Sequence, residues 1–501
     1  MNRIIRINIF LFYLIIFSLR ANSGPNPDSM NTCKERLPNE INSYQPVLVP
    51  LLTPDGRRIY YDRKWHPKNI NSTNDQDDIW YSDRISQGIW SEPKNLTELN
   101  TFDSDVLFWI SPDGRIGLVY GIYSDKHIQK KQGFSFSEYD GNNWSKPESL
   151  NIKNFYNDSL HFYANLSADG KILIMSVSRK DAVGGLDLYV SFLNEKTQEW
   201  SAPLNMGKEI NTKGNEETPY LAYDNKTLYF SSNGYKGEGE QDLYFSRRPD
   251  DSWKRWSKPQ NLGKGINTKF GEQGICLTAL GDSAIIVSYD SVSKRKGLYW
   301  ICLPKEAQPE PYTIVSGDIN IKNNNDKITD VNIFVNDLPE QKIRIGLLKN
   351  YSIVIPEKKI YKIRVEAENF STGSFEFDSR DIKWPQIIKY DFNLEQIKNI
   401  NEKFIIYFDT DSYELNEENK KIIDEFYKEY RKNKIQISGY ADETGTEDYN
   451  MILSMKRAKQ VRDYLVNKGL KIKNIQINAM GEKEPISEDY SKNRRVEIII
   501  K

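Results

Sequence analysis

Short runs of apolar residues alternate with turn-forming residues over the first three hundred positions of the chain. In each repeat a turn separates two apolar runs, and this arrangement predicts a β-hairpin. A third apolar run and a Trp-Ser-x-Pro motif complete most repeats, so each repeat predicts about four strands. The turns are Asp55-Gly56, Asp113-Gly114, Asp169-Gly170, Asp224-Asn225 and Gly281-Asp282, and the Trp motifs begin at Trp90, Trp144, Trp200 and Trp256.

The Trp motifs follow one another at steps of 54, 56 and 56 residues, which predicts five units of about 55 residues. Such units cannot bury their own faces singly, and together they predict a five-bladed β-propeller over residues 46–304. The repeats resemble the PD-type, TolB-like propeller repeats, which implies a binding surface rather than a particular reaction. A linear β-solenoid is the alternative. We expect the repeated Trp side chains to pack between blades rather than to stack on carbohydrate.

Prolines interrupt the repeats and predict a short stiff linker over residues 305–311. From residue 312 to 395 apolar and polar residues alternate, as they do in strands that bury one face. This segment predicts a small β-sandwich. It resembles the carboxypeptidase-regulatory-like fold, and the resemblance implies a spacer without catalytic residues of its own. The positions that carry the resemblance are Gly317, Tyr351 and Tyr361.

The last hundred residues change from a strand pattern to alternating strands and helices, which predicts an α/β sandwich over residues 400–501. Asn416 is the expected N-cap of the first helix. Gly469 is expected to end the second helix. The chain is therefore predicted to be multidomain and mainly β, with one α/β domain at its C-terminal end. The expected elements are strand 404–408, helix 416–432, strand 435–440, helix 447–468, strand 475–480 and strand 495–500.

The N-terminus carries basic residues, then an apolar run, then a small-x-small pattern, and this order predicts a secretory signal peptide over residues 1–23. A permanent membrane anchor is the alternative, although the apolar run is about half the length needed to span a bilayer. Residues 24–45 form an N-terminal segment before the repeats. We expect the exported protein in the periplasm, associated with the outer membrane and the cell wall.

Charge and composition narrow the functional classes. Lys plus Arg (69) nearly equals Asp plus Glu (70), so no global field favours nucleic acid, and membrane association is expected to be peripheral. The three cysteines, Cys33, Cys276 and Cys302, are too few for a disulfide framework. A bridge between Cys276 and Cys302 or two buried thiols are the alternatives. The three histidines are scattered, so neither a metal site, a cofactor nor catalytic residues are predicted.

Three short motifs in the last hundred residues occur in a characteristic order: Gly439-Tyr440-Ala441-Asp442, then Asn450 to Ala458, then Asn493-Arg494-Arg495. They resemble the OmpA C-terminal, peptidoglycan-binding domain. The resemblance implies that Asp442 and Arg457 hold diaminopimelate of the peptidoglycan stem peptide. Ala441 departs from the family pattern because a Thr is usual there, and the segment before Asn493 is shorter than usual. Both departures concern accessory contacts.

The chemistry of the two key residues suits this ligand. Diaminopimelate presents an ammonium beside a carboxylate, so Asp442 can accept from the ammonium while the Arg457 guanidinium forks onto the carboxylate. A structural salt bridge between these two residues is the alternative. For Arg494, exposed pairing with Glu497 is the alternative to ligand contact. By resemblance, the accessory ligand residues are Asp409, Thr410, Thr444, Asn450 and Arg494.

Together these patterns predict a non-catalytic envelope protein that binds peptidoglycan through its C-terminal domain. The propeller is expected to dock an outer-membrane or periplasmic protein, as part of an outer-membrane or secretion assembly. The domain order resembles proteins that include the peptidoglycan-anchoring subunit of type IX secretion. One alternative is a wall-targeted glycan-processing enzyme with its active site in the propeller. Another is a structural wall linker whose propeller binds surface proteins or sugars passively.

Overall fold

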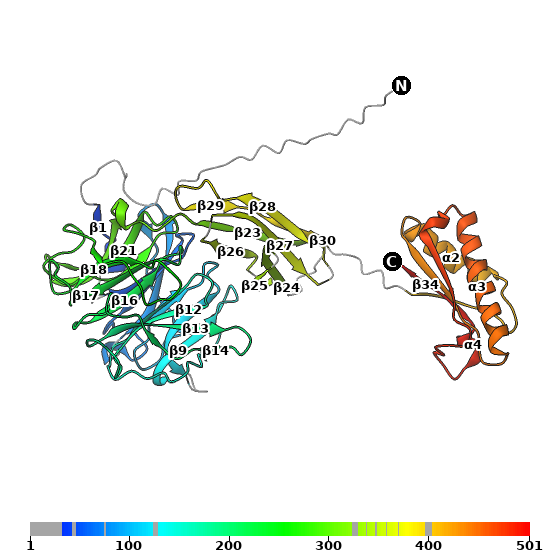
Figure 1. Cartoon of the computed structure of the whole chain (residues 1–501), viewed down its shortest axis with the longest axis horizontal. Coiled ribbons are helices and arrows are strands. Elements are labelled where there is room, and N and C mark those ends of the chain that lie inside the picture. The colour runs from blue at the N-terminus through cyan, green and yellow to red at the C-terminus, as the bar shows by residue number, and fades with distance from the viewer. Residues whose placement is uncertain are drawn as a thin grey trace, which may run out of the picture. The chain divides into compact units, whose positions relative to one another are not determined.

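In the computed structural model the chain forms two compact units, Met1–Glu395 and Gln396–Lys501 (Figure 1). It describes residues 33–42, 47–74, 77–123, 129–322, 329–336, 338–345, 348–356, 358–368, 370–395 and 403–500. The expected signal peptide lies outside these residues. Within them, no helix has both the length and the apolar composition required to cross a membrane.

The first unit begins with five antiparallel sheets of four or five strands. The first contains β2 (Val47–Leu52), β3 (Arg58–Arg63), β4 (Asp78–Ser86), β5 (Ile89–Trp90) and β6 (Lys94–Asn95). The second contains β7 (Leu107–Ile110), β8 (Ile116–Tyr123), β9 (Gln129–Glu138) and β10 (Glu148–Ser149). The third contains β11 (Tyr163–Leu166), β12 (Ile172–Val177), β13 (Asp187–Asn194), β14 (Glu199–Trp200) and β15 (Leu204–Asn205). The fourth contains β16 (Glu216–Leu221), β17 (Thr227–Ser232), β18 (Asp242–Arg247) and β19 (Gln260–Asn261).

The fifth sheet joins the two ends of this region. It contains β20 (Gln273–Leu277), β21 (Ser283–Asp290), β22 (Arg295–Cys302) and, as its fourth strand, β1 (Lys34–Arg36). The first strands of the sheets contact one another in sequence, β2 with β7, β7 with β11, β11 with β16 and β16 with β20, and β20 also contacts β2. The N-terminal region is therefore a mainly β, multi-sheet body.

The repeated sequence signals have structural roles. The predicted hairpin turns are confirmed, since Gly56, Gly114 and Gly170 each have positive φ between two antiparallel strands. All four motif Trp side chains are buried. In the first, third and fourth sheets an Asn brackets one residue of the third strand with two hydrogen bonds: Asn100 with Ile79, Asn211 with Leu188 and Asn267 with Leu243.

Residues 34–42 of the expected N-terminal segment supply the same features to the fifth sheet. After β1 comes the short helix α1 (Asn39–Asn42). The Asn42 side chain accepts from Leu298 N at 2.8 Å and donates to Leu298 O at 3.0 Å, which repeats the bracket of the first, third and fourth sheets. Lys34 lies 3.6 Å from the buried carboxylate of Glu272. The N-terminal segment thus supplies the fourth strand and the bracketing Asn of the fifth sheet.

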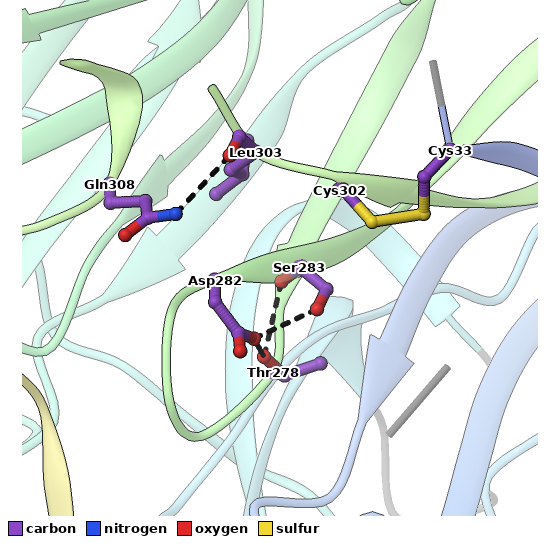
Figure 2. The surroundings of a disulfide bond; sticks show 7 residues. All are labelled: Cys33, Thr278, Asp282, Ser283, Cys302, Leu303 and Gln308. Carbon is purple, nitrogen blue, oxygen red and sulfur yellow. Dashed lines mark hydrogen bonds between the residues drawn. A yellow bond between two sulfur atoms is a disulfide. The ribbon is translucent and has the colours of Figure 1, made fainter. Parts of the chain in front are cut away.

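A disulfide between Cys33 and Cys302 fastens β1 to β22, close to the β20–β21 turn that carries Thr278 and Asp282 (Figure 2). Cys276 is a buried free thiol. Both predicted alternatives, a Cys276 to Cys302 bridge and two buried thiols, are wrong, because Cys302 pairs with Cys33. Cys276 and Cys302 lie on β20 and β22, which both pair with β21, so nearly two strand spacings of about 4.8 Å separate them. That separation exceeds the reach of a disulfide.

The 3-10 turn Lys305–Ala307 leads into two further sheets of the first unit. One contains β23 (Thr313–Lys322), β26 (Asn350–Ile355), β29 (Gln386–Lys389) and β30 (Phe392–Glu395), and the other β24 (Thr329–Val335), β25 (Leu338–Ile345), β27 (Ile360–Ala367) and β28 (Gly373–Asp378). Their buried residues, among them Ile319, Ile333 and Val365, form one core. Arg115 joins this region to the second sheet because its guanidinium donates to Leu348 O and Asn350 O, both at 2.9 Å.

The second unit is a four-stranded sheet with helices. Along the chain it contains β31 (Phe404–Tyr407), α2 (Glu417–Tyr430), β32 (Ile435–Gly439), α3 (Glu447–Asn467), β33 (Ile475–Ala479), α4 (Tyr490–Asn493) and β34 (Arg495–Ile500). The strand order is β31-β34-β32-β33, with β32 and β33 parallel. The Asn416 cap is confirmed by its 2.8 Å bond from Asn419 N, and Gly469 follows α3 at φ 108°. The short helix α4 was not predicted.

Candidate functional site

Asp442 lies three residues beyond the end of β32, in the loop that leads to α3. Its side chain is nearly buried, with 6% of its surface exposed. One carboxylate oxygen accepts from Thr444 Oγ1 at 2.5 Å, and the other forms an ion pair with Arg494 Nη1 at 2.9 Å. Burial acts to raise the pKa of Asp442, but the hydrogen bonds from Thr444 and Arg494 outweigh it and hold the pKa below 3.8. The carboxylate is therefore charged at neutral pH.

Arg457 lies in the middle of α3 and is completely buried. Its guanidinium donates to three backbone carbonyls: Ser412 O at 2.8 Å, Tyr440 O at 2.9 Å and Asp409 O at 3.2 Å. Burial lowers the pKa of Arg457 to about 10, which leaves the group charged at neutral pH. Three of its five N–H donors hold carbonyls of the loops after β31 and β32, so this side chain ties the two loops together.

A close approach of α3 to β32 brings Arg457 to the loops after β31 and β32. A Cβ at Gly439 would lie 2.0 Å from Ser454 O, so only glycine lets the helix pack this near the strand. Ser454 Oγ in turn accepts from Gly481 N at 3.0 Å. The Gly and Ser positions of the sequence motifs thus set the distance between the helix that carries Arg457 and the loop that carries Asp442.

The structure brings Arg494 to the key carboxylate. Its guanidinium contacts Asp442, and its Nε donates to Phe408 O at 3.1 Å. The alternative of pairing with Glu497 is wrong, because Glu497 is engaged by Arg495 and Lys403, both at 2.6 Å. The alternative salt bridge between Asp442 and Arg457 is not formed either, since Asp442 pairs with Arg494.

The other predicted residues surround this pair in different ways. Asp409 and Thr410 are exposed in the loop after β31, and Asp409 meets Arg457 through its carbonyl rather than its carboxylate. Thr444 contacts Asp442 directly. Asn450 is 2% exposed and donates to Glu482 Oε2 at 2.7 Å. The structure thus joins Asp442 to Thr444 and Arg494, and Arg457 to the carbonyl of Asp409, whereas Asn450 contacts Glu482 instead.

Two contacts near the site were missed by the sequence reasoning. Tyr449, in the first turn of α3, donates to the carboxylate of Asp411, which has a left-handed φ of 57°. Tyr490 of α4 donates to Glu443 Oε1 at 2.5 Å. Both Tyr side chains are exposed by more than 40%. The sequence gives little sign of these contacts, because the two residues of each pair are about forty positions apart.

Comparison with known proteins supports an assignment for this unit. The model of the OmpA family matches residues 407–498. The peptidoglycan-associated lipoprotein of Buchnera aphidicola is 35% identical over 148 residues, which cover 28% of this chain and 77% of that protein. Through this domain the chain belongs to the OmpA family.

Other relatives match a shorter part of the chain. The peptidoglycan-associated lipoprotein of Pseudomonas putida is 34% identical over 99 residues, 18% of this chain, and the chain spans only 60% of that relative's length. Among solved structures, the peptidoglycan-associated lipoprotein from Burkholderia pseudomallei is 28% identical, with 19% of this chain and 89% of that chain covered and a TM-score of 0.19. The residues that the family model matches, 407–498, make up about a fifth of the protein.

Proposed function

We propose that this protein is a non-catalytic component of the cell envelope that binds peptidoglycan through its OmpA-family domain. The observation that carries the proposal is the charged carboxylate of Asp442, held between Thr444 and Arg494 beside the buried guanidinium of Arg457. An OmpA-like domain implies peptidoglycan binding, and the relatives named above are called peptidoglycan-associated. The ligand group that fits this arrangement is the diaminopimelate of the stem peptide.

The negative Asp442 and the positive Arg457 suit the ammonium and the carboxylate of diaminopimelate. The diaminopimelate ammonium would donate to Asp442, whose low pKa keeps it ionised. The carboxylate would accept from Arg457 through the N–H groups that do not donate to the three carbonyls, assisted by Arg494. Burial of both Asp442 and Arg457 weakens competition from water, which strengthens such contacts.

Two charged contacts are too few for tight binding. Hydrogen bonds to charged groups contribute about 1.5–3 kcal/mol each, and micromolar affinity needs about 8 kcal/mol. We therefore assign accessory contacts to the exposed loop residues Asp409 and Thr410, to Thr444 and to Asn450. The polymeric wall adds avidity, because a dissociated domain meets another stem peptide at once.

For the first unit we propose that the five sheets are the blades of a closed β-propeller that docks an outer-membrane or periplasmic protein. Support comes from the cyclic order in which the first strands contact one another. It also comes from β1, which completes the fifth sheet next to the disulfide. The protein would then anchor an outer-membrane or secretion assembly to the wall, from the periplasmic side. The Cys33–Cys302 disulfide fits that oxidising location.

The experiment is a binding assay of the full exported chain with purified peptidoglycan and with a diaminopimelate stem peptide. Asp442→Asn keeps the shape of the side chain and removes its charge, so we expect binding to fall about 10- to 150-fold, from the loss of one charged hydrogen bond. Arg494→Gln tests the partner of Asp442. Arg457→Ala is a poor test by itself, because it leaves three carbonyls without their donor.

Glu417→Gln is the matched control, since this exposed carboxylate at the start of α2 pairs with Lys420. We expect it to bind as the unchanged chain does. Thermal unfolding of every variant must show a folded domain. If the unchanged chain fails to bind, or if a folded Asp442→Asn variant binds as well as the Glu417→Gln control, the proposed role of this site is refuted.

A further inference from the structure

Basic side chains gather at one end of the second unit, where α2 and α3 end and where β32 and β33 begin. Two loops form this end, residues 431–434 between α2 and β32 and residues 468–474 between α3 and β33. Neither loop contains an Asp or a Glu. We call their six basic residues the basic pole, and all six are exposed: Arg431, Lys432, Lys434, Lys468, Lys471 and Lys473.

The two loops of the basic pole are neighbours in space. β32 and β33 are parallel, with Ile435 opposite Ile475, so the loops that precede these strands lie side by side. The loop after α3 also meets the last turns of α2, because a Cβ at Gly469 would lie 2.8 Å from the hydroxyl of Tyr427. Two segments that are far apart in the sequence therefore form one basic surface patch.

The proposed peptidoglycan site lies at the opposite end of the same unit, because Asp442 comes after the last residue of β32 whereas Lys434 precedes the first. α3 runs between the two ends (Figure 1), and its 21 residues span about 30 Å. The loops at the site end, residues 408–416, 440–446 and 480–489, carry nine acidic residues and one basic residue. At physiological salt charges are screened beyond about 8 Å, so this acidic end does not neutralise the basic pole.

Contacts inside the unit account for only part of this positive charge. Arg431 and Lys468 are the C-caps of α2 and α3, where the helix dipole favours a cation. Lys468 also forms an ion pair with an Asp of α2, with 3.0 Å between the ammonium nitrogen and the carboxylate. The dipole effect falls off within the last turn of a helix, so it does not explain Lys434, Lys471 and Lys473. Within the described residues 403–500, none of these three side chains forms an ion pair.

An apolar side chain stands within the basic pole. Ile472 begins a 3-10 turn between Lys471 and Lys473, and 64% of its surface is exposed. Leu470, two residues earlier, is buried in the core of the unit, so the loop is anchored without Ile472. A single exposed apolar residue is common on protein surfaces. Between two lysines, however, it has the pattern of a membrane-surface contact, in which the apolar group enters the headgroup layer while the ammonium groups stay at its surface.

We propose that the basic pole binds the anionic surface of a lipid bilayer, with Ile472 entering the headgroup layer and the surrounding basic groups pairing with lipid phosphates. A soluble polyanion would match the charge but would leave Ile472 without a contact, so the apolar side chain favours a bilayer. The unit would then rest on a membrane at one end while the proposed site around Asp442 holds the wall at the other. This inference goes beyond the proposed peptidoglycan binding and does not depend on it.

The test is co-sedimentation of the full exported chain with lipid vesicles at constant ionic strength. One set of vesicles contains about one third phosphatidylglycerol in phosphatidylcholine, and the reference set contains phosphatidylcholine alone. Each Lys or Arg near an anionic membrane strengthens binding about 5-fold. We therefore expect the vesicles with phosphatidylglycerol to bind the chain at least 10-fold more tightly than the reference vesicles. Long-chain polyphosphate, titrated in parallel, is the soluble polyanion.

Substitutions locate the surface and separate a bilayer from a polyanion. The double variant Lys471→Gln, Lys473→Gln should weaken binding to the anionic vesicles at least 10-fold. Its control is Lys483→Gln, Lys492→Gln, which removes the same charge from two exposed lysines at the site end and should change binding less than 2-fold.

Ile472→Asn leaves the charge unchanged and should weaken vesicle binding at least 3-fold while leaving polyphosphate binding as it was. Circular dichroism must show that each variant is folded, which we expect because every substituted side chain is exposed. The proposal is overturned if the two kinds of vesicle bind equally, if the two double variants lose the same affinity, or if Ile472→Asn binds the anionic vesicles as tightly as the unchanged chain.

Discussion

The bond between Cys33 and Cys302 is predicted to be the largest single stabilising contact of the first unit. It joins residues 269 positions apart, so it encloses all five sheets in one covalent loop. Replacing both cysteines by Ser removes that constraint from the unfolded chain. The noncovalent contacts of the N-terminal segment, such as the bracket of Asn42 on Leu298, would remain.

The magnitude follows from the length of the loop. In the chain-entropy account a loop of 100 residues gives about 4.7 kcal/mol, and a loop of this length gives about 5 to 6 kcal/mol. If the free energy of unfolding falls by about 3 kcal/mol per molar of urea, the loss of the disulfide should lower the urea concentration at the unfolding midpoint by about 2 M. That is more than most single substitutions cost.

The chain offers a clean assay. All ten Trp residues lie between positions 65 and 384, so Trp fluorescence reports the first unit without interference from the second. Urea unfolding should be followed for the unchanged chain with and without reductant, and for the Cys33→Ser, Cys302→Ser double variant. Cys276→Ser is the control for the buried thiol, which forms no disulfide.

We expect reductant to lower the midpoint of the unchanged chain to that of the double variant and to leave the double variant unaffected. The reasoning is refuted if the oxidised chain and the double variant unfold at the same urea concentration. It is also refuted if Cys276→Ser abolishes the effect of reductant, since that would require a different pairing.

Three further outcomes follow from buried groups. Burial and the charge of Asp77 raise the pKa of Asp62 well above 3.8. The folded state therefore binds the Asp62 proton more tightly than the unfolded state does, and the stability of the folded state falls as pH rises above 3.8. Asp62→Asn should remove this fall, measured as the urea midpoint between pH 4 and 8. Arg457→Ala should cost about 3 kcal/mol or more, because three carbonyls lose their donor, and circular dichroism at 222 nm will measure it. Gly439→Ala should cost about 1–3 kcal/mol in the same assay, through its clash with Ser454 O.

Much of the C-terminal domain could be predicted from its sequence because its signals are local. The expected helices begin and end within two residues of α2 and α3, since Asn416 and Gly469 act through bonds to neighbouring backbone. The repeated turns were predictable for the same reason: glycine at positive φ is a property of a few consecutive residues. Such features need no knowledge of the rest of the fold.

The features that escaped prediction join distant parts of the chain. The partner of Cys302 lies 269 residues away, in a segment that carries no repeat motif. The partner of Asp442 is Arg494, 52 residues away, although Arg457 lies nearer in the sequence.

The geometry of Arg457 also changes what its presence in the motif means. A guanidinium that holds three carbonyls is needed for the domain to keep its loops in place, with or without a ligand. The Asp442 carboxylate accepts from the side chains of Thr444 and Arg494 and, more weakly, from the backbone N–H of Thr444. Replacing Asp442 therefore disturbs the fold less than replacing Arg457. Because loss of binding can then be separated from loss of structure, Asp442 is the residue at which the proposed function is decided.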